Sequence, residues 1–240
     1  MAARRDRVVA VVEHLPEFSA KSVSIIIPVY NEASQLDASL NSLFEGIPGN
    51  AEIEVILSDG GSTDDTLAIA KQYPCRVLDS KTGRARQMNA ACHHANGDYL
   101  LFLHADSTLP DNWLKQVQAS QKWGFFPVKL SGRHWLLRVI ENAINFRSRI
   151  SKVATGDQGL FFSQSFFHHL DGFPDIPIME DVALSKRARK LSKPTIGRYP
   201  VTTSSRRWEQ NGIIKTIFLM WGLRFAYWLG ISPDRLHRIY

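Results

Sequence analysis

The chain of 240 residues has 44% hydrophobic and 22% charged side chains, values close to those of ordinary globular proteins. These figures exclude an intrinsically disordered chain, a collagen and a disulfide-rich miniprotein, because the two cysteines could form at most one bridge. The net charge of +6 is unevenly distributed: residues 182–240 carry a balance of +10, and residues 1–181 a balance of −4. The basic C-terminal part therefore faces an anionic partner or offsets the acidic remainder.

Two apolar stretches bear on localisation. Residues 8–12 follow three arginines, but the run is too short for the core of a signal peptide. Residues 213–229 contain Lys215 and Arg224 and fall about one turn short of the roughly 20 residues that span a bilayer. We therefore expect a cytoplasmic protein, with peripheral contact to the inner face of the membrane left open.

The first half of the chain alternates between strand-like and helix-like segments after an N-terminal extension at residues 1–20. In chain order we expect a strand at 23–28, a helix at 31–44, a strand at 53–57, a helix at 66–72, a strand at 75–78, a helix at 83–95 and a strand at 98–103. This alternation predicts an α/β fold with a mainly parallel central sheet flanked by helices.

The second half is less regular. We expect helices at 111–123, 134–150, 180–191 and 213–229, and a strand at 160–162. The helix at 134–150 is amphipathic, with one stripe formed by Leu136, Val139, Ile140, Ala143 and Ile144. No repeat or low-complexity linker divides the chain, which predicts one domain over 21–240.

The last of these helices carries an aromatic stripe, formed by Ile217, Trp221, Phe225 and Trp228. Such a stripe is typical of a core helix that closes the domain. Together with the neighbouring basic residues it also suits an anionic membrane surface. The sequence leaves both alternatives open.

Ligands of parallel α/β sheets bind beyond the carboxyl ends of the strands. The loops expected there are residues 28–32, 59–64 and 104–106, and each is polar, acidic or glycine-bearing. Neither the P-loop motif nor the dinucleotide fingerprint occurs in the sequence, which excludes both of these phosphate-binding loops.

Two carboxylates in these loops have a chemical and a structural interpretation. In a strand His104 and Asp106 point to the same side, where they could hold Mg²⁺ or Mn²⁺ with a diphosphate, or Asp106 could cap a turn. Asp59 precedes two glycines, so it could contact a base or ribose, or form an Asx-turn.

Three further groups of residues also allow both a chemical and a structural interpretation. Glu180 and Asp181 stand where a helix begins, so they complement the helix dipole or supply a general base. Arg84 lies at the start of another helix and suits a phosphate. Residues 206–208, Arg-Arg-Trp, form a solvated loop or surround a nucleotide or acceptor.

These segments, in this order, resemble the family 2 glycosyltransferases, which have the GT-A fold. The matching residues are 24–32, 54–64, 83–89, 97–106, 172–173 and 180–181. The resemblance implies a nucleotide pocket lined by Pro28, Tyr30, Glu32, Asp59, Arg84 and His104, a divalent cation on Asp106, a catalytic base at Asp181 and an orienting Glu180. It also implies inversion at the anomeric carbon, a UDP-sugar as the favoured donor, and Mg²⁺ or Mn²⁺ as the cofactor.

The sequence departs from the family pattern at three places. His104 replaces the usual first aspartate, which favours a contact with ribose or water. Gly60 replaces the second aspartate of the usual Asp-Asp-Gly-Ser. Residues 204–208 lack the glutamine of the motif found in processive synthases, so we expect transfer of a single sugar.

The expected partners are a nucleotide sugar and an unidentified acceptor, with a lipid or lipid-linked acceptor and an anionic membrane surface left open. No module for nucleic acid is evident. A sugar nucleotidyltransferase is one alternative, although its glycine-rich basic stretch is missing after the first expected strand. A degenerate GT-A nucleotide-binding protein without activity is the other.

Overall fold

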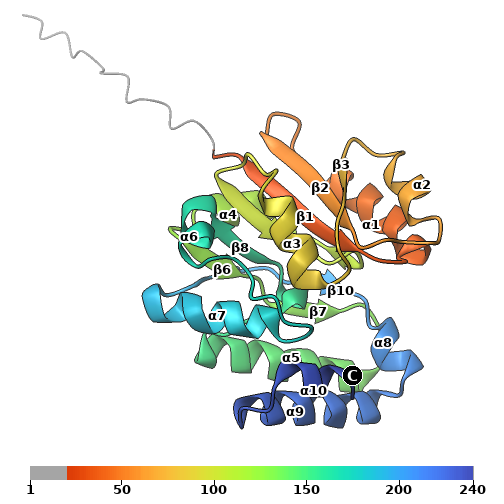
Figure 1. Cartoon of the computed structure of the whole chain (residues 1–240), viewed down its shortest axis with the longest axis vertical. Coiled ribbons are helices and arrows are strands. Elements are labelled where there is room, and N and C mark those ends of the chain that lie inside the picture. The colour runs from red at the N-terminus through yellow and green to blue at the C-terminus, as the bar shows by residue number, and fades with distance from the viewer. Residues whose placement is uncertain (1–20, 240) are drawn as a thin grey trace, which may run out of the picture.

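The computed structural model describes residues 21–239, and the predicted extension at residues 1–20 lies outside the described residues. A seven-stranded sheet forms the centre, in the order β3-β2-β1-β4-β8-β6-β9 (Figure 1). Its strands are β1 (Val23–Val29), β2 (Ile53–Asp59), β3 (Arg76–Asp79), β4 (Tyr99–Phe102), β6 (Trp123–Phe125), β8 (Leu160–Ser163) and β9 (Thr195–Ile196).

The sheet is mainly parallel, which confirms the prediction. β1 pairs in parallel with β2 and β4, and β2 pairs in parallel with β3. β8 runs antiparallel to both of its neighbours, β4 and β6. All seven residues of β1 are buried, because helices cover both faces of the sheet and leave no polar side for the strand.

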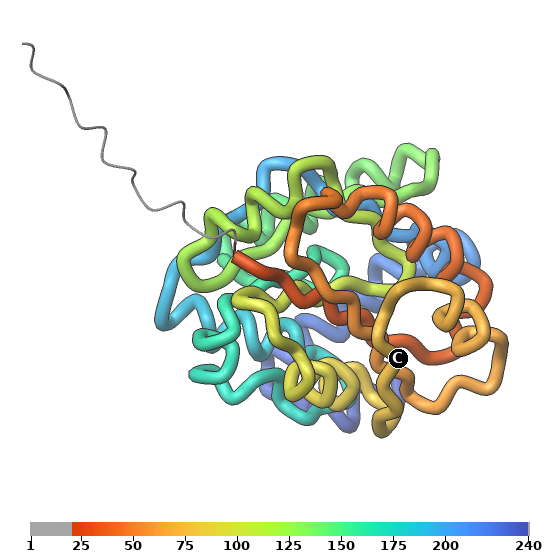
Figure 2. Tube along the Cα trace, turned by 90° about the horizontal axis from the view of Figure 1, so that it is seen from above, coloured from red at the N-terminus to blue at the C-terminus, as the bar shows by residue number. Residues whose placement is uncertain are grey.

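Two sets of helices enclose the sheet. α1 (Ala33–Glu45), α2 (Thr66–Ala70) and α4 (Trp113–Gln118) pack on one face. α3 (Arg84–Cys92), α6 (Gln164–His169) and α7 (Glu180–Leu191) pack on the other. Figure 2 shows α1 and α3 on opposite sides of β1. The hydrophobic core is therefore divided by the sheet into two layers.

A smaller layer follows at one end of the molecule. It contains a three-stranded sheet in the order β5-β10-β7, with β5 (Ser107–Thr108), β7 (Val128–Leu130) and β10 (Val201–Thr203). Its helices are η1 (Gly156–Gln158), α5 (Trp135–Ser151), α8 (Arg206–Gln210), α9 (Ile213–Trp228) and α10 (Pro233–His237). α5, α9 and α10 gather at the bottom of Figure 1. None of the helices within residues 21–239 combines the length and the hydrophobicity needed to cross a membrane.

The helix expected at 111–123 is shorter than predicted. α4 ends at Gln118, and Trp123 begins β6 instead. Trp123 is fully buried, its indole stacks on Phe162, and its Nε1 donates to the carbonyl oxygen of Ser192 at 2.9 Å. Burial of this large side chain inside the sheet outweighs the local helical pattern.

Two predicted apolar stripes lie differently from expectation. In α5 the buried side chains include Leu137 and Ile140, whereas Val139 of the predicted stripe is 55% exposed. In α9 the three aromatic residues of the stripe face outward, with Trp221, Phe225 and Trp228 at 63%, 60% and 71% exposed, whereas Ile217 packs on a buried cluster. The core interpretation of these three aromatic residues was therefore wrong, because α9 packs through the opposite side, where Leu223 is buried.

Candidate active site

The candidate site lies at the carboxyl ends of β1, β2 and β4. Val29 pairs with Asp59, so β1 and β2 end at the same level of the sheet. The buried side-chain amide of Gln87 donates to the carbonyl oxygens of Val29 and Ser58, at 2.7 and 2.8 Å. These bonds attach α3 to both strand ends and place Arg84, the first residue of α3, beside this edge.

Gly60, the second departure from the family pattern, is matched to Gln87. A Cβ atom at residue 60 would lie 3.1 Å from the Gln87 side-chain amide. A side chain there would push the amide away from the two carbonyl groups that it binds. Glycine at residue 60, where the family usually has an aspartate, therefore suits the close packing of Gln87 and α3 on the sheet.

The carboxylate of Asp59 is used within its own loop. Asp59 is 2% exposed, and it accepts from the backbone N–H groups of Gly61 and Ser62, both at 2.9 Å, and from the Ser62 hydroxyl. Three donors occupy most of the acceptor positions of one carboxylate. The turn interpretation accounts for these bonds, and a direct contact with a base stays a prediction.

The loop after β1 is fixed by the loop after β2. Asn31 has a φ of 53°, and its side-chain oxygen accepts from the backbone N–H of Thr63 at 2.8 Å. Next to it, Tyr30 is 50% exposed, whereas Pro28 is buried within β1. Of the residues expected to line the nucleotide pocket here, Tyr30 and Glu32 are accessible and Pro28 is covered by protein.

Glu32, Asp106 and Arg206 form a charged group at this edge. Oε2 of Glu32 lies 3.9 Å from Nη2 of Arg206, whose Nη1 donates to the Ser34 hydroxyl at 2.9 Å. Burial, followed by the negative charge of Asp106, raises the pKa of Glu32, and Arg206 acts in the opposite direction. The structure thus brings Arg206, which the sequence left open, beside a predicted nucleotide residue.

Asp106 is the candidate metal ligand. It is half-buried and accepts from the hydroxyls of Ser107 and Thr203, both at 3.3 Å. Within residues 21–239 no cluster of three or more His, Cys, Asp or Glu side chains could hold a metal ion. Mg²⁺ commonly takes one or two protein carboxylates and completes its coordination with waters and substrate phosphates. The single carboxylate fits a cation that arrives with a diphosphate.

The alternation argument for His104 and Asp106 was wrong. β4 ends at Phe102, and Asp106 lies in a turn, so the period of a strand does not set the directions of these side chains. The strand ends early because the chain turns there into β5, which pairs with β10 in the smaller sheet.

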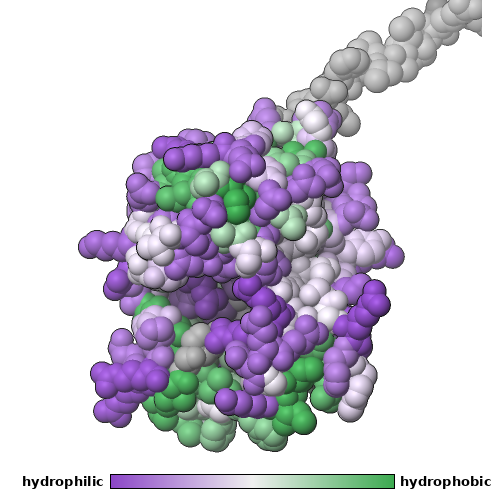
Figure 3. Space-filling model, turned by 90° about the vertical axis from the view of Figure 1, so that its right-hand side faces the viewer, coloured by the Kyte–Doolittle hydropathy of each residue, from purple (hydrophilic) through white to green (hydrophobic). Residues whose placement is uncertain are grey.

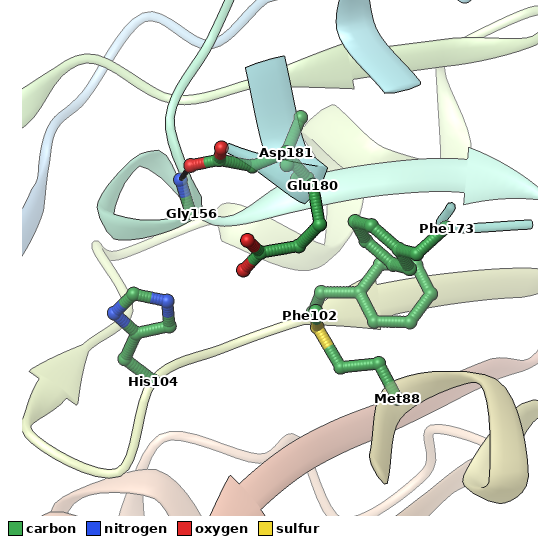
Figure 4. A pocket seen from close by; sticks show the side chains of 8 residues that line it. Met88, Phe102, His104, Gly156, Phe173, Glu180 and Asp181 are labelled. Carbon is green, nitrogen blue, oxygen red and sulfur yellow. Dashed lines mark hydrogen bonds between the residues drawn. The ribbon is translucent and has the colours of Figure 1, made fainter. Parts of the chain in front are cut away.

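His104 instead faces the carboxylates that open α7. Its ring lines a small pocket (Figure 4) with Met88, Phe102, Gly156, Leu160, Phe173, Glu180 and Asp181. Burial, together with the charge of Arg84, lowers the pKa of His104 to about 3, so the ring is neutral near pH 7. A neutral imidazole has one donor and one acceptor nitrogen, which suits a hydroxyl or a water but adds no positive charge.

Glu180 and Asp181 open α7, which confirms the predicted start of this helix. Glu180 is 3% exposed, and its Oε1 lies 3.6 Å from Nε of Arg84. Burial, followed by the charge of Asp181, raises the pKa of Glu180 to about 7, against the effect of Arg84. Met179, just before, has a φ of 67°, which is unusual for a residue with a side chain. Perturbed carboxylates and strained backbone of this kind are typical of functional sites.

Asp181 is held by η1. The backbone N–H of Gly156 donates to its Oδ2 at 2.6 Å, as the dashed line in Figure 4 shows. A Cβ atom at residue 156 would lie 2.6 Å from Nε2 of His104, so glycine lets the backbone pass between the imidazole and the carboxylate. Asp181 itself is half-buried and stays accessible to a substrate.

A group of half-buried charges near Asp181 was missed by the sequence analysis. Arg147 of α5, Asp157 of η1 and Arg224 of α9 come together there. Burial and the charge of Arg224 lower the pKa of Arg147 to about 10, opposed by Asp157 and Asp181. Nε of Arg147 and Oδ1 of Asp157 are buried without a hydrogen-bond partner among residues 21–239. No local pattern could have found this group, because its members come from three separate elements.

The raised pKa of Glu180 predicts a measurable cost in stability. The folded value of about 7 exceeds the ordinary 4.5, so the folded protein holds this proton while the unfolded chain loses it, and stability falls as the pH rises from 4.5 to 7. Glu180→Gln should therefore stabilise the protein above pH 7 by about 3 kcal/mol and change little below pH 4.5. Denaturant titration at both pH values measures this difference.

The control for this prediction is Glu52→Gln, which changes an exposed glutamate in the same way. Its free energy of unfolding should follow that of the unchanged protein at every pH. A Glu180→Gln variant that is less stable than the unchanged protein above pH 7 would contradict the assigned pKa.

Residues 24–125, somewhat less than half of the chain, match the model of glycosyl transferase family 2. Over 98 residues it is 39% identical to the PGL/p-HBAD biosynthesis glycosyltransferase of Mycobacterium tuberculosis. That match covers 38% of this chain and 38% of the curated relative, so the two proteins share well under half of their length.

Solved structures extend the likeness in fold over most of the chain. Staphylococcus aureus TarS residues 1–349 in complex with UDP has a TM-score of 0.64 and 22% identity, covering 76% of this chain and 60% of that one. The mannosyltransferase PcManGT from Pyrobaculum calidifontis in complex with GDP-Man and Mn²⁺ has a TM-score of 0.59 and 21% identity, covering 78% and 57%. These likenesses confirm the predicted fold class.

Proposed function

We propose that the protein is an inverting glycosyltransferase that moves a single sugar from a UDP-sugar to a hydroxyl group of an acceptor. The observation that supports this most directly is the carboxylate pair Glu180 and Asp181, which shares one pocket with His104 just beyond the end of β4. In parallel α/β sheets this edge is where ligands bind. We take 21–110 as the nucleotide-binding half and 111–240 as the acceptor-binding half of one domain.

The nucleotide is placed over the ends of β1 and β2. The exposed ring of Tyr30 offers a surface for the base, and Asp59 holds the loop of Gly61 and Ser62 against it. Pro28 supports this loop from within β1, and Glu32 and His104 supply polar contacts to the ribose. The choice of UDP is supported by the fold neighbour TarS, which was solved in complex with UDP.

Positive charge for the diphosphate comes from two arginines on opposite sides of the strand ends. Arg84 opens α3, and Arg206 opens α8 and lies near Glu32. Asp106 would hold Mg²⁺ or Mn²⁺, and the bound cation would neutralise negative charge on the leaving diphosphate. PcManGT, solved with GDP-Man and Mn²⁺, supports a cation in this kind of fold.

Asp181 acts as the general base. Its carboxylate takes the proton of the acceptor hydroxyl while that oxygen attacks the anomeric carbon, and the bond from this carbon to the diphosphate oxygen breaks. Attack from the face opposite the leaving group inverts the anomeric centre. The hydrogen bond from Gly156 holds one oxygen of Asp181, which limits the rotation of the carboxylate during the transfer.

Glu180 and Arg84 orient the donor sugar beside this base. The ion pair at 3.6 Å connects the helix that carries the catalytic base with the helix that meets the diphosphate. A partly protonated Glu180 can both donate to and accept from sugar hydroxyls near neutral pH. We place the protein in the cytoplasm, at the inner face of the membrane, with a lipid or lipid-linked acceptor.

Nucleotide binding tests the proposal. Calorimetric titration with UDP, GDP, dTDP and CDP, each with and without Mn²⁺, should show Mn²⁺-dependent binding of UDP in preference to the others. Release of UDP from a UDP-sugar then establishes transfer. UDP binding without any release across a panel of UDP-sugars would favour the degenerate binding protein, and no nucleotide binding at all would contradict the proposal.

A further inference from the structure

Two helices at one end of the molecule expose an unusual amount of apolar surface. α5 exposes Trp135, Val139, Phe146 and Ile150, and α9 exposes Ile214, Phe218, Trp221, Phe225, Trp228 and Leu229. Each set recurs at helical spacing, so it forms a stripe along one side of its helix. We call the two stripes together the apolar end surface. Figure 3 shows hydrophobic side chains gathered at this end of the molecule, below a largely hydrophilic middle.

The two stripes lie on neighbouring helices. Ile144 of α5 and Ile213 and Ile217 of α9 pack on the same buried cluster, so the helices are neighbours. Figure 1 shows α5, α9 and α10 side by side at this end. Contiguous apolar patches beyond a few hundred Å² are rare on monomeric proteins and mark sites of interaction with proteins or membranes.

The charges around the apolar end surface are positive. Residues 211–233 contain no Asp or Glu, and Lys215 is exposed on α9. Arg149 is exposed on α5, and Arg235 is exposed on α10 next to an exposed Asp234, so the basic side chains are in excess but not alone. The single acidic residue of α5, Glu141, is turned to an internal ion pair with Arg138 at 3.2 Å. Aromatic residues framed by basic side chains are the pattern of a helix that lies in the interface of an anionic bilayer.

We propose that the apolar end surface docks on an anionic lipid bilayer, with α5 and α9 lying in the plane of the interface. Trp221, Phe225 and Trp228 insert among the acyl chains near the headgroups, and the basic side chains meet lipid phosphates. The positive balance of residues 182–240 provides the charge that complements an anionic surface. A second copy of the chain, also basic in this region, lacks that complementarity.

The opposite side of α9 adjoins the candidate catalytic base. Leu223, on the side of α9 away from the aromatic stripe, shares a buried cluster with Ile178 and with Met179, the residue before Glu180 and Asp181. α9 therefore lies between its exposed aromatic stripe and the segment that leads into the carboxylate pair. Docking would bring the hydroxyl of a lipid headgroup or lipid-linked acceptor within reach of Asp181. This consequence rests on the proposed function, whereas the docking itself does not.

Sedimentation of the full chain with vesicles tests the docking. The protein should bind vesicles of phosphatidylcholine mixed with phosphatidylglycerol, bind vesicles of phosphatidylcholine alone more weakly, and lose affinity for the mixed vesicles as salt is raised. The double variant Trp221→Glu, Phe225→Glu should bind the mixed vesicles at least about tenfold more weakly than the unchanged protein, because two apolar anchors are lost.

The matched control is Leu191→Glu, Tyr199→Glu, which makes the same charge change at two exposed apolar residues outside the surface. This control should bind the mixed vesicles about as well as the unchanged protein, and circular dichroism checks that both double variants are folded. No binding to the mixed vesicles, or equal loss in both variants, would overturn the proposal. The proposal would also be overturned if the unchanged protein bound no vesicles but formed a dimer in sedimentation velocity, and if only the double variant at Trp221 and Phe225 were monomeric.

The same preparations separate this proposal from the proposed function. Vesicle binding by a protein that binds no nucleotide would contradict the glycosyltransferase activity and leave the docking intact. If the protein showed Mn²⁺-dependent UDP binding but bound neither kind of vesicle, the result would contradict the docking and leave the proposed function intact.

Discussion

Asp181→Asn should slow sugar transfer by a factor of about 10² to 10⁴, the range that a positioned general base contributes. The side-chain amide has nearly the same size as the carboxylate, and its oxygen can still accept one of the two hydrogen bonds that Asp181 receives from the backbone N–H groups of Gly156 and Val182. It cannot take the proton of an acceptor hydroxyl. The rate of UDP release from a UDP-sugar, with water or an added alcohol as the acceptor, measures the loss, and the affinity for UDP should stay unchanged.

The control for this variant is Asp175→Asn. Asp175 lies in the loop before the same helix, is largely exposed and pairs with Arg86 at 2.8 Å, so it carries the same chemistry outside the pocket. Its variant should transfer sugar at the normal rate. If Asp181→Asn keeps full activity and Glu180→Gln loses it, the roles of base and orienting residue are reversed.

Asp106→Ala should weaken Mn²⁺-dependent UDP binding by about 10²-fold, because a bound cation contributes several kcal/mol to the stabilisation of phosphate charge. Within residues 21–239 no cluster of three or more metal-ligating side chains could compensate for the loss. Calorimetric titration of the variant with UDP, in the presence of Mn²⁺, measures the change. Removing the metal from the unchanged protein with a chelator should produce the same weakening.

Asp111→Ala is the matched control for Asp106→Ala, since it removes an exposed aspartate a few residues further along the chain. Its affinity for UDP should match that of the unchanged protein with and without Mn²⁺. Equal UDP affinity of the unchanged protein in Mn²⁺ and in chelator would show that the cation takes no part in nucleotide binding, and would remove Asp106 from the site.

In the first half of the chain the order of strands and helices was predictable because each segment there carries its own periodicity, whereas the short strands β5, β6, β7, β9 and β10 were not predicted. The run Val23–Val29 is apolar at nearly every position, which is typical of a strand covered on both faces, and β1 is buried throughout. The start of α7 at Glu180 was predictable as well, because carboxylates are favoured in the first turn of a helix. The prediction of a helix as far as Trp123 failed because the burial of this side chain depends on residues distant in sequence, Phe162 and Ser192, and not on the local pattern.

The location of the candidate site was predictable, whereas the hydrogen bonds and protonation states of its side chains were not. The strand ends placed Asp59, Asp106 and their neighbours at one edge of the sheet, because parallel strands share that edge. Which acceptor positions of Asp59 remain available depends on Gly61 and Ser62, whose N–H groups turn toward it only in the folded loop. The neutral state of His104 likewise depends on burial and on Arg84.

The sequence by itself therefore determined the fold class, the order of the elements in the first half of the chain and the resemblance to the family 2 glycosyltransferases, since these rest on local periodicity and on motifs of contiguous residues. Only the tertiary structure decided which distant groups meet. It brings Arg224 of α9 beside Asp181 and Arg206 beside Glu32, and it turns Trp221 outward instead of into the core. The physical reason is that charge interactions and burial depend on distances in space, which are set by the packing of whole helices on the sheet.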